Sequence, residues 1–228
     1  MVSTSLAGAS VLLLGATGGL GSALGLELAS RGALLTLVGR DQDRLDRLDL
    51  PGARVALDLR SPDACARAVG AAVDHNGHLD VVINAVGVVA FGDVESLSTD
   101  VMEELFLTNT FIPMMISQEA MTNLSPGGVV VNISGVIAEQ NLPGMAAYGA
   151  SKAAVLAFDQ ALAREARRKG LRVLDARPPH TETGLAGRAI AGTAPRMGVG
   201  LEPSAVARVI CDAIESGATD LPSGAFAT

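Results

Sequence analysis

Aromatic side chains are nearly absent from this chain of 228 residues, in which tryptophan does not occur and Tyr148 is the only tyrosine. Hydrophobic residues still make up 49% of the sequence, so the core must consist mainly of Ala, Val, Leu and Ile. Such a composition suits β-branched strands covered by alanine-rich helices.

Cysteine and clustered positive charge are also scarce. Cys65 and Cys211 are the only cysteines, which is too few for a disulfide framework, and they lack the spacing of metal ligands. We therefore expect no metal site and a reducing, cytoplasmic location. The net charge is -7 and Lys and Arg are scattered, which argues against a nucleic-acid surface because phosphate binding needs concentrated positive charge.

A long hydrophobic run is missing from the amino terminus. This region is apolar but has no positively charged start, and Gly15, Gly18, Gly19 and Gly21 interrupt it before it reaches the length of a membrane span. We therefore expect no targeting segment, no transmembrane segment and no membrane partner.

Short apolar runs and longer helical patterns alternate along the chain. The runs are short and rich in Val and Leu, and they predict strands at residues 10–15, 34–38, 53–59, 79–84, 128–134 and 171–176. Helices are predicted at residues 21–31, 62–73, 100–106, 112–124, 151–169 and 203–216, and residues 218–228 allow one further short strand. We therefore expect residues 1–228 to form a single α/β domain, a doubly wound parallel sheet with helices on both faces.

Residues 184–201 interrupt this alternation, since they are rich in Gly, Ala and Pro and have no regular period. Ligands of a doubly wound sheet bind beyond the carboxyl ends of its strands. A segment after the sixth strand is well placed to cover a substrate there, so we predict a lid, with a flexible spacer as the alternative.

A glycine-rich loop joins the first predicted strand to the first predicted helix. Gly15, Gly19 and Gly21 form a GxxxGxG pattern, which permits a tight turn and close approach of a pyrophosphate to the free N–H groups at the helix start. A plain glycine turn is the alternative. The position between strand and helix favours a dinucleotide site.

The residues that follow the second predicted strand bear on the choice of nucleotide. Gly39-Arg40 stands where an acidic residue would bind the adenosine ribose. A guanidinium can instead hold a 2′-phosphate through paired hydrogen bonds. Asp41 follows immediately and could bind a ribose, so we predict NADP(H) as the preferred cofactor and keep NAD(H) as the alternative.

Tyr148 and Lys152 form a YxxxK segment. Four-residue spacing places both side chains on one face of a helix. A neighbouring ammonium favours the phenolate and lowers the pKa of a tyrosine, so this pair could move protons at a carbonyl or alcohol. A packed tyrosine beside a surface lysine is the alternative.

The glycine loop, Asn84-Ala85-Val86-Gly87 and YxxxK together resemble the classical short-chain dehydrogenase/reductase family over nearly the whole chain. The resemblance implies a single Rossmann-like NAD(P)-binding domain, assembled as a homodimer or homotetramer. It implies that Tyr148 is the general acid/base, that Lys152 holds the nicotinamide ribose, and that Asn109 supports a proton-relay water. The cofactor-binding residues that the loop and the resemblance indicate are Gly15, Thr17, Gly18, Gly19, Leu20, Gly21, Arg40, Asp58, Leu59, Asn84, Ala85, Gly87, Tyr148, Lys152, Pro178, Thr181 and Thr183.

The sequence departs from the family pattern at one chemical position. The family's substrate-orienting serine stands thirteen residues before the tyrosine, where this chain has Gly135. Ser134 is adjacent, and it replaces the missing hydroxyl only if the strand has ended or bulged there, because successive strand residues point to opposite faces. The family's Asn-Asn-Ala-Gly and Pro-Gly turns also differ, the latter being Pro178-Pro179.

The leading hypothesis is an NADP(H)-dependent oxidoreductase that interconverts a small-molecule carbonyl and an alcohol, with Tyr148 moving the proton. Gly135 supports an alternative, a nucleotide-binding partner or regulator without redox turnover. A third interpretation keeps Tyr148 as an acid/base for non-redox chemistry, because the fold does not fix the reaction.

Overall fold

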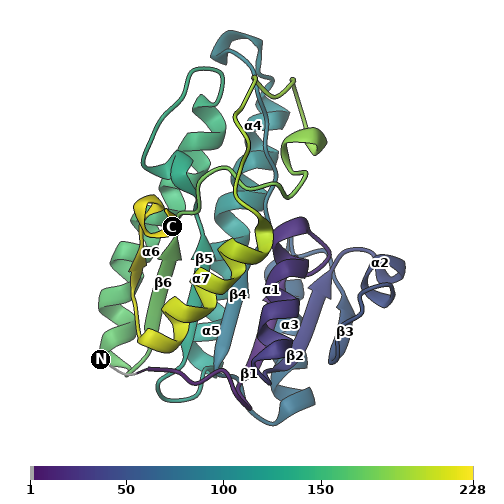
Figure 1. The fold of residues 1–228 in the computed structure, drawn as a ribbon, viewed down its shortest axis with the longest axis vertical. Coiled ribbons are helices and arrows are strands. Elements are labelled where there is room, and N and C mark those ends of the chain that lie inside the picture. Colours follow the sequence, from purple (N-terminus) through teal and green to yellow (C-terminus); the bar gives the residue numbers. More distant parts are fainter. Residues whose placement is uncertain (1–2, 228) are drawn as a thin grey trace.

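The computed structural model describes residues 3–227, so residues 1, 2 and 228 of the predicted domain lie outside the described part. Its strands form one parallel sheet in the order β3-β2-β1-β4-β5-β6-β7 (Figure 1). The strands are β1 (Ser10–Leu14), β2 (Leu34–Gly39), β3 (Ala53–Ala56), β4 (Val81–Asn84), β5 (Val129–Ile133), β6 (Arg172–Ala176) and β7 (Asp220–Leu221). The predicted doubly wound α/β fold is confirmed.

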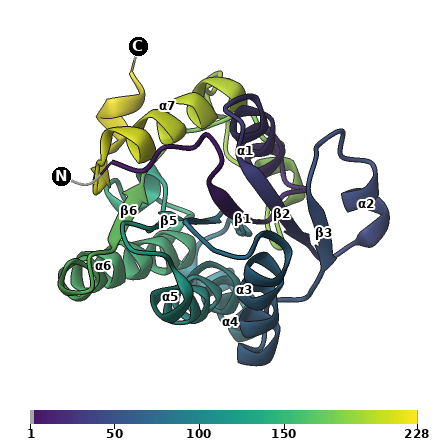
Figure 2. The same ribbon diagram turned by 90° about the horizontal axis from the view of Figure 1, so that it is seen from below.

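Helices cover both faces of the sheet, as Figure 2 shows. The helices are α1 (Gly19–Ser30), α2 (Gln42–Asp46), α3 (Pro62–Asn76), α4 (Thr99–Phe106), α5 (Ile112–Asn123), α6 (Ala146–Arg168) and α7 (Pro203–Ser216). Helices α1 and α7 pack on one face, and α3, α4, α5 and α6 lie on the other.

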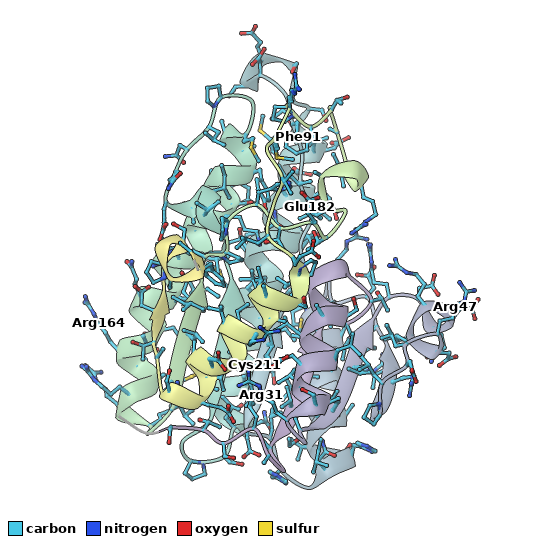
Figure 3. All side chains as sticks on the ribbon, viewed as in Figure 1. Arg31, Arg47, Phe91, Arg164, Glu182 and Cys211 are labelled. Atoms are coloured by element: carbon cyan, nitrogen blue, oxygen red, sulfur yellow. The ribbon has the colours of Figure 1, made fainter. Side chains whose placement is uncertain are left out.

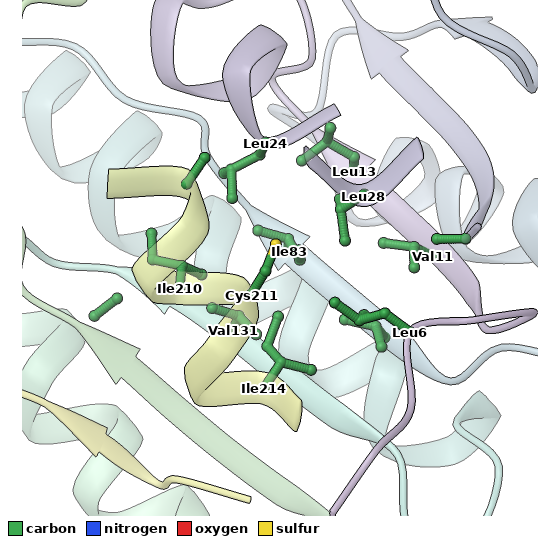
Figure 4. Close-up of a cluster of buried hydrophobic side chains, with 14 of the residues drawn as sticks. Leu6, Val11, Leu13, Leu24, Leu28, Ile83, Val131, Ile210, Cys211 and Ile214 are labelled. Carbon is green, nitrogen blue, oxygen red and sulfur yellow. The ribbon is translucent and has the colours of Figure 1, made fainter. Parts of the chain in front are cut away.

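The core is aliphatic, as the composition predicted. Leu24 and Leu28 of α1 meet Ile210, Cys211 and Ile214 of α7 over the sheet, and all of these side chains are fully buried (Figure 4). Each such side chain contributes about 1.5–3 kcal/mol to the free energy of folding. The strands beneath are buried along almost their whole length, as expected for a sheet covered on both faces.

The helix boundaries follow from local capping. The Ser61 hydroxyl accepts a hydrogen bond from the Ala64 amide, Pro62 occupies the first turn of α3, and Gly77 ends the helix in the left-handed conformation. Helix α6 begins at Ala146, before the predicted residue 151, so Tyr148 lies within it. The short helix α2 was not predicted.

The strand order reverses between β1 and β4, and the loops beyond these strands diverge there. The Ala85 amide donates to the Leu14 carbonyl, which holds the two loops side by side. Figure 1 shows the segment between β6 and α7 crossing the same end of the sheet. This switch point is where doubly wound sheets bind ligands.

Other expectations concern membranes, metals and cysteines. Within residues 3–227, no helix combines the length and hydropathy needed to cross a bilayer. The same part of the chain holds no group of three or more His, Cys, Asp or Glu side chains arranged for a metal ion. Cys65 and Cys211 are buried in α3 and α7 as free thiols.

Candidate active site

The glycine loop between β1 and α1 packs too tightly for side chains. A Cβ atom on Gly21 would lie 2.1 Å from the Gly15 carbonyl oxygen, so glycine is required for α1 to approach the loop. Helix α1 starts after Gly18 with no side-chain cap and no acidic residue in its first turn. Its first N–H groups and its dipole are therefore available to an anion.

A cavity of about 270 Å³ opens beside this loop, and we call it the Arg40 cavity. Its charged residues are four arginines and one aspartate: Arg40, Arg44, Arg60, Arg188 and Asp58. Of the predicted cofactor-binding residues, the structure brings Gly15, Thr17, Gly18, Arg40, Asp58, Leu59, Ala85 and Gly87 to its wall. The excess of guanidinium groups suits an anionic ligand.

Helix α2 brings a second arginine to this cavity, and Asp41 caps the helix. The Asp41 carboxylate caps α2 by accepting a hydrogen bond of 3.1 Å from the Arg44 amide. The Arg44 guanidinium donates to the Thr17 carbonyl at 2.8 Å, which places it over the glycine loop. Sequence reasoning missed Arg44 because the helix that carries it was not predicted, although Arg44 stands one turn after Arg40.

A second cavity, of about 280 Å³, adjoins the first and shares Gly18, Ala85 and Gly87 with it. We call it the Tyr148 cavity. It gathers the predicted residues Gly19, Leu20, Gly21, Ser134, Tyr148, Lys152, Pro178, Thr181 and Thr183. Its far end is apolar and contains Val89, Phe91, Ile137, Leu142 and Met145, none of which the sequence singled out. Figure 3 places Phe91 at the same end of the molecule as Glu182.

Tyr148 and Lys152 lie on one face of α6, as their spacing predicted. The Lys152 ammonium donates a hydrogen bond of 2.7 Å to the Ile133 carbonyl at the end of β5. Burial lowers the pKa of Lys152 to about 8 and raises the pKa of Tyr148 to about 12. In the free protein, burial thus moves the tyrosine pKa opposite to our expectation, because loss of hydration penalises the phenolate.

Asn109 sits in the π-helical turn η2 (Leu107–Phe111) that joins α4 to α5. Its side chain is fully buried, accepts from the Val88 amide, and donates to the Val88 carbonyl and the Ser151 hydroxyl. This arrangement locks the loop after β4 onto α6 next to Lys152. Asn84 lies at the end of β4, where its carbonyl oxygen accepts from the Val86 amide, and it does not belong to either cavity wall.

The chain leaves regular strand geometry at Ser134 and Gly135. Strand β5 ends at Ile133, and the amides of Ser134 and Gly135 both donate to the Ala176 carbonyl. The strand therefore ends before Ser134, so the Ser134 side chain need not follow the alternating directions of the strand residues. Its hydroxyl is nevertheless completely buried and has no hydrogen-bond partner among the described residues. Gly135 adopts φ +85°, and a Cβ atom there would meet only the Pro178 carbonyl, at 3.9 Å.

Known proteins share this combination of features. A family model described as short chain dehydrogenase matches residues 9–193. The hydroxynaphthalene reductase-like protein Arp2 of Metarhizium anisopliae is 32% identical over 190 residues, which cover 79% of this chain and 71% of the relative. The dehydrogenase/reductase SDR family member 7B of Danio rerio is 29% identical over 226 residues, covering 90% of this chain and 73% of that protein.

Solved structures share the fold at low identity. A short chain dehydrogenase/reductase from Burkholderia phymatum in complex with NAD superposes with a TM-score of 0.88 at 20% identity, covering 96% of this chain and 90% of that one. A short chain dehydrogenase from Burkholderia cenocepacia in complex with NADP gives a TM-score of 0.83 at 24% identity, covering 98% and 100%. Both nicotinamide nucleotides therefore occur in proteins with this architecture.

Proposed function

This chain belongs to the short-chain dehydrogenase/reductase family and is an NAD(P)-dependent dehydrogenase/reductase, and on that premise we propose that it interconverts a carbonyl compound and an alcohol with NADP(H). The observation that carries the proposal is that one apolar cavity contains Tyr148 and Lys152 and opens into a second cavity rich in arginine. The first has the groups for proton transfer, and the second has the charge for a phosphorylated nucleotide.

The charges of the Arg40 cavity support NADP(H) over NAD(H). Arg60 forms ion pairs with Asp58 and Glu104. Arg40 and Arg44 form no ion pair within residues 3–227, so both can meet a 2′-phosphate. Asp41, the alternative ribose ligand, is engaged in capping α2. An exposed guanidinium pair favours a phosphate and needs no acidic partner.

The residues present fit such a nucleotide. Gly15, Thr17 and Gly18 would hold the pyrophosphate at the start of α1, Arg40 and Arg44 the 2′-phosphate, and Lys152 the nicotinamide ribose. When bound, the nicotinamide supplies or accepts the hydride at the substrate carbon. Tyr148 donates its phenolic proton to the oxygen of the reduced carbonyl, and the neighbouring ammonium of Lys152 stabilises the phenolate that remains.

The substrate class follows from the far end of the Tyr148 cavity. Phe91, Ile137, Leu142 and Met145 offer no charge there, and a cavity of about 280 Å³ has room for a small to medium molecule. We infer a neutral, mainly apolar ketone, aldehyde or alcohol.

Residues 184–201 act in this proposal as the lid predicted from the sequence. Leu185, Arg188 and Met197 reach the cavities from this segment. Isolated bridges attach the middle of the segment, at Ala191, to Ala90 and its last residue, Leu201, to Thr181. We further propose action in the reducing cytoplasm, consistent with two free buried cysteines, and a homodimer or homotetramer, consistent with Phe111 being 53% exposed between α4 and α5.

A panel of carbonyl compounds with NADPH, followed by nucleotide absorbance, tests the proposal. Consumption of NADPH with formation of an alcohol supports it. Gly135 favours a second candidate, a nucleotide-binding protein without turnover, because the substrate-orienting hydroxyl is missing at that position. NADPH binding without consumption across the panel would favour that candidate, and product formation without consumption would indicate non-redox chemistry.

A further inference from the structure

A buried polar layer lies behind Tyr148 and Lys152, between α6 and the strands β5 and β6. Asn132 and Asp175 are direct register partners in these strands. Asp159 stands two turns after Lys152 on α6, and its carboxylate accepts a hydrogen bond of 2.7 Å from the Asn132 amide group. Their exposed fractions are 0% for Asn132, 2% for Asp159 and 3% for Asp175. Two carboxyl groups are thus enclosed between α6, which carries Lys152, and the strands β5 and β6.

Several polar atoms of this layer have no hydrogen-bond partner within the described part of the chain. They are Oδ1 of Asn132, Oγ of Ser134, Oδ2 of Asp159 and Oδ1 of Asp175. The Ser134 hydroxyl lies next to the Asp175 carboxylate but outside hydrogen-bonding geometry. An unpaired buried polar group costs about 1–3 kcal/mol, so packing alone does not account for such a layer.

Carboxylates outnumber guanidinium groups around Arg177, at the edge of this layer. The Arg177 guanidinium contacts three carboxylates, those of Asp175, Glu139 and Asp220. One guanidinium cannot neutralise three carboxylates, and the bound arginine favours the ionised form of Asp175 while burial raises its pKa. Burial raises the pKa of Asp159 further, which favours its uncharged form. Of the two acids in the layer, Asp175 is therefore the one whose charge is stabilised by an ion pair, and its charge opposes the fall in the pKa of Lys152.

We propose that Asp175 is a positioning residue for Lys152, the counter-charge that holds this lysine in its ammonium form behind Tyr148. The role in turnover rests on the proposed function, in which Lys152 must be charged to stabilise the tyrosine phenolate. The Lys152 ammonium donates to the carbonyl of Ile133, the residue after Asn132, which is the register partner of Asp175. The carboxylate therefore acts on the ammonium from a neighbouring position of the sheet and without a hydrogen bond to it.

The other groups around Lys152 do not replace this counter-charge. Helix α6 contributes Tyr148 and Asp159. Burial raises the pKa of both groups, which favours the neutral phenol and the uncharged carboxyl group. Strand β5 and turn η2 contribute the uncharged side chains of Asn132, Ser134 and Asn109, and Gly87 faces the ammonium from the loop after β4. Burial lowers the pKa of Lys152 to about 8 even though the Asp175 carboxylate opposes that fall.

The composition of the chain allows a direct test without turnover. Lys152 and Lys169 are its only lysines, so carbon-13 labelling of lysine side chains gives two NMR signals, of which exposed Lys169 is the internal reference. In the free wild-type protein, we expect the Lys152 signal to titrate with a midpoint of about 8. In Asp175→Asn, we expect that midpoint to fall by about one pH unit, because the opposing charge is gone.

Asp159→Asn is the matched control. It removes a buried carboxyl group from the same layer, and we expect the Lys152 midpoint to stay within a few tenths of a pH unit, since burial raises the pKa of Asp159 and favours its uncharged form. An unchanged midpoint in Asp175→Asn would overturn the proposal. An equal fall in both variants would also overturn it, because the effect would then come from packing.

A second variant covers the case in which Asp175→Asn does not fold. Asp220 forms an ion pair with Arg177, and its side chain is 61% exposed. Asp220→Asn therefore removes negative charge near Arg177 at little risk to the core. We expect a smaller fall of the Lys152 midpoint in the same direction, and no fall would overturn the proposal.

Activity then separates this proposal from the proposed function. If the wild type consumes NADPH, its activity should fall at alkaline pH as Lys152 loses its proton. In Asp175→Asn this fall should occur at a lower pH than in the wild type, by the same amount as the shift of the Lys152 midpoint. A wild type that consumes no NADPH would reject the proposed function, while the Lys152 titration would still decide the counter-charge.

Discussion

The ammonium group of Lys152 donates a hydrogen bond of 2.7 Å to the carbonyl oxygen of Ile133, the last residue of β5. One of its three donors is thereby fixed, and the side chain is held in the wall of the Tyr148 cavity, near Gly87, which lines both cavities. The remaining donors are available to a nucleotide ribose. This hydrogen bond holds a lysine with an exposed fraction of 6%, which forms no salt bridge with any residue from 3 to 227.

Replacement of Tyr148 by phenylalanine removes the proposed proton donor and keeps the ring. We expect Tyr148→Phe to lower turnover by at least about two orders of magnitude, because general acid/base catalysis contributes roughly that much. NADPH binding, measured by nucleotide fluorescence, should be retained. The exposed change Gln160→Ala on the same helix is the control, and near-normal turnover of Tyr148→Phe would remove the phenol from the mechanism.

The single tyrosine also permits a direct pKa measurement. Tyrosinate absorbance reports only Tyr148, and in the folded free protein we expect a midpoint of about 12. The unfolded chain should titrate near 10. Because the folded pKa is the higher one, folding favours the neutral phenol, and that contribution to stability is lost as the pH rises from about 10 toward 12. A folded-state midpoint below 10 would contradict this expectation.

Arg40→Ala should weaken NADPH far more than NADH. The loss of a charge-assisted hydrogen bond is worth about 1.5–3 kcal/mol, which corresponds to roughly ten- to hundredfold in the dissociation constant. Arg44→Ala should act in the same direction. Arg47→Ala is the control, since Arg47 ends α2 outside the cavity wall and lies at the edge of the molecule in Figure 3. Equal losses for both nucleotides would refute a 2′-phosphate site.

Gly135→Ser tests whether a hydroxyl is missing from the site. The positive φ of +85° strains any side chain there, by about 1–3 kcal/mol, so Gly135→Ala serves as the matched control for strain. A donor to the developing oxyanion contributes about 3 kcal/mol, or roughly a hundredfold in rate. We expect the serine variant to reduce a ketone at least about tenfold faster than the alanine variant.

Ser134→Ala gives the complementary result. If the Ser134 hydroxyl already orients the substrate, this variant should lose most of the turnover and Gly135→Ser should gain little. NADPH binding must be normal in each variant. If no variant departs from the wild type by more than about threefold, no hydroxyl at the end of β5 takes part in the mechanism.

The sequence by itself determined the fold class, the glycine loop and the pairing of Tyr148 with Lys152. These features depend on short-range patterns: the period of apolar residues, glycine where backbones approach closely, and a four-residue spacing on one helix face. The predicted strands at residues 10–15 and 171–176 correspond to β1 (Ser10–Leu14) and β6 (Arg172–Ala176) for the same reason. Local spacing also gave Arg40 its place beside the loop, since it follows β2 directly.

Only the tertiary structure decided the surroundings of these groups. The role of Asp41 as a helix cap depends on the short helix α2, whose five residues are too few to show a period. The pKa of Tyr148 depends on how completely other elements bury it, and here burial raises it to about 12. Asp175 and Lys152 are separated in the sequence, and only the packing of α6 on β6, which lies beside β5, brings their elements together. Burial and long-range electrostatic contact arise from packing between distant segments, and no local pattern encodes them.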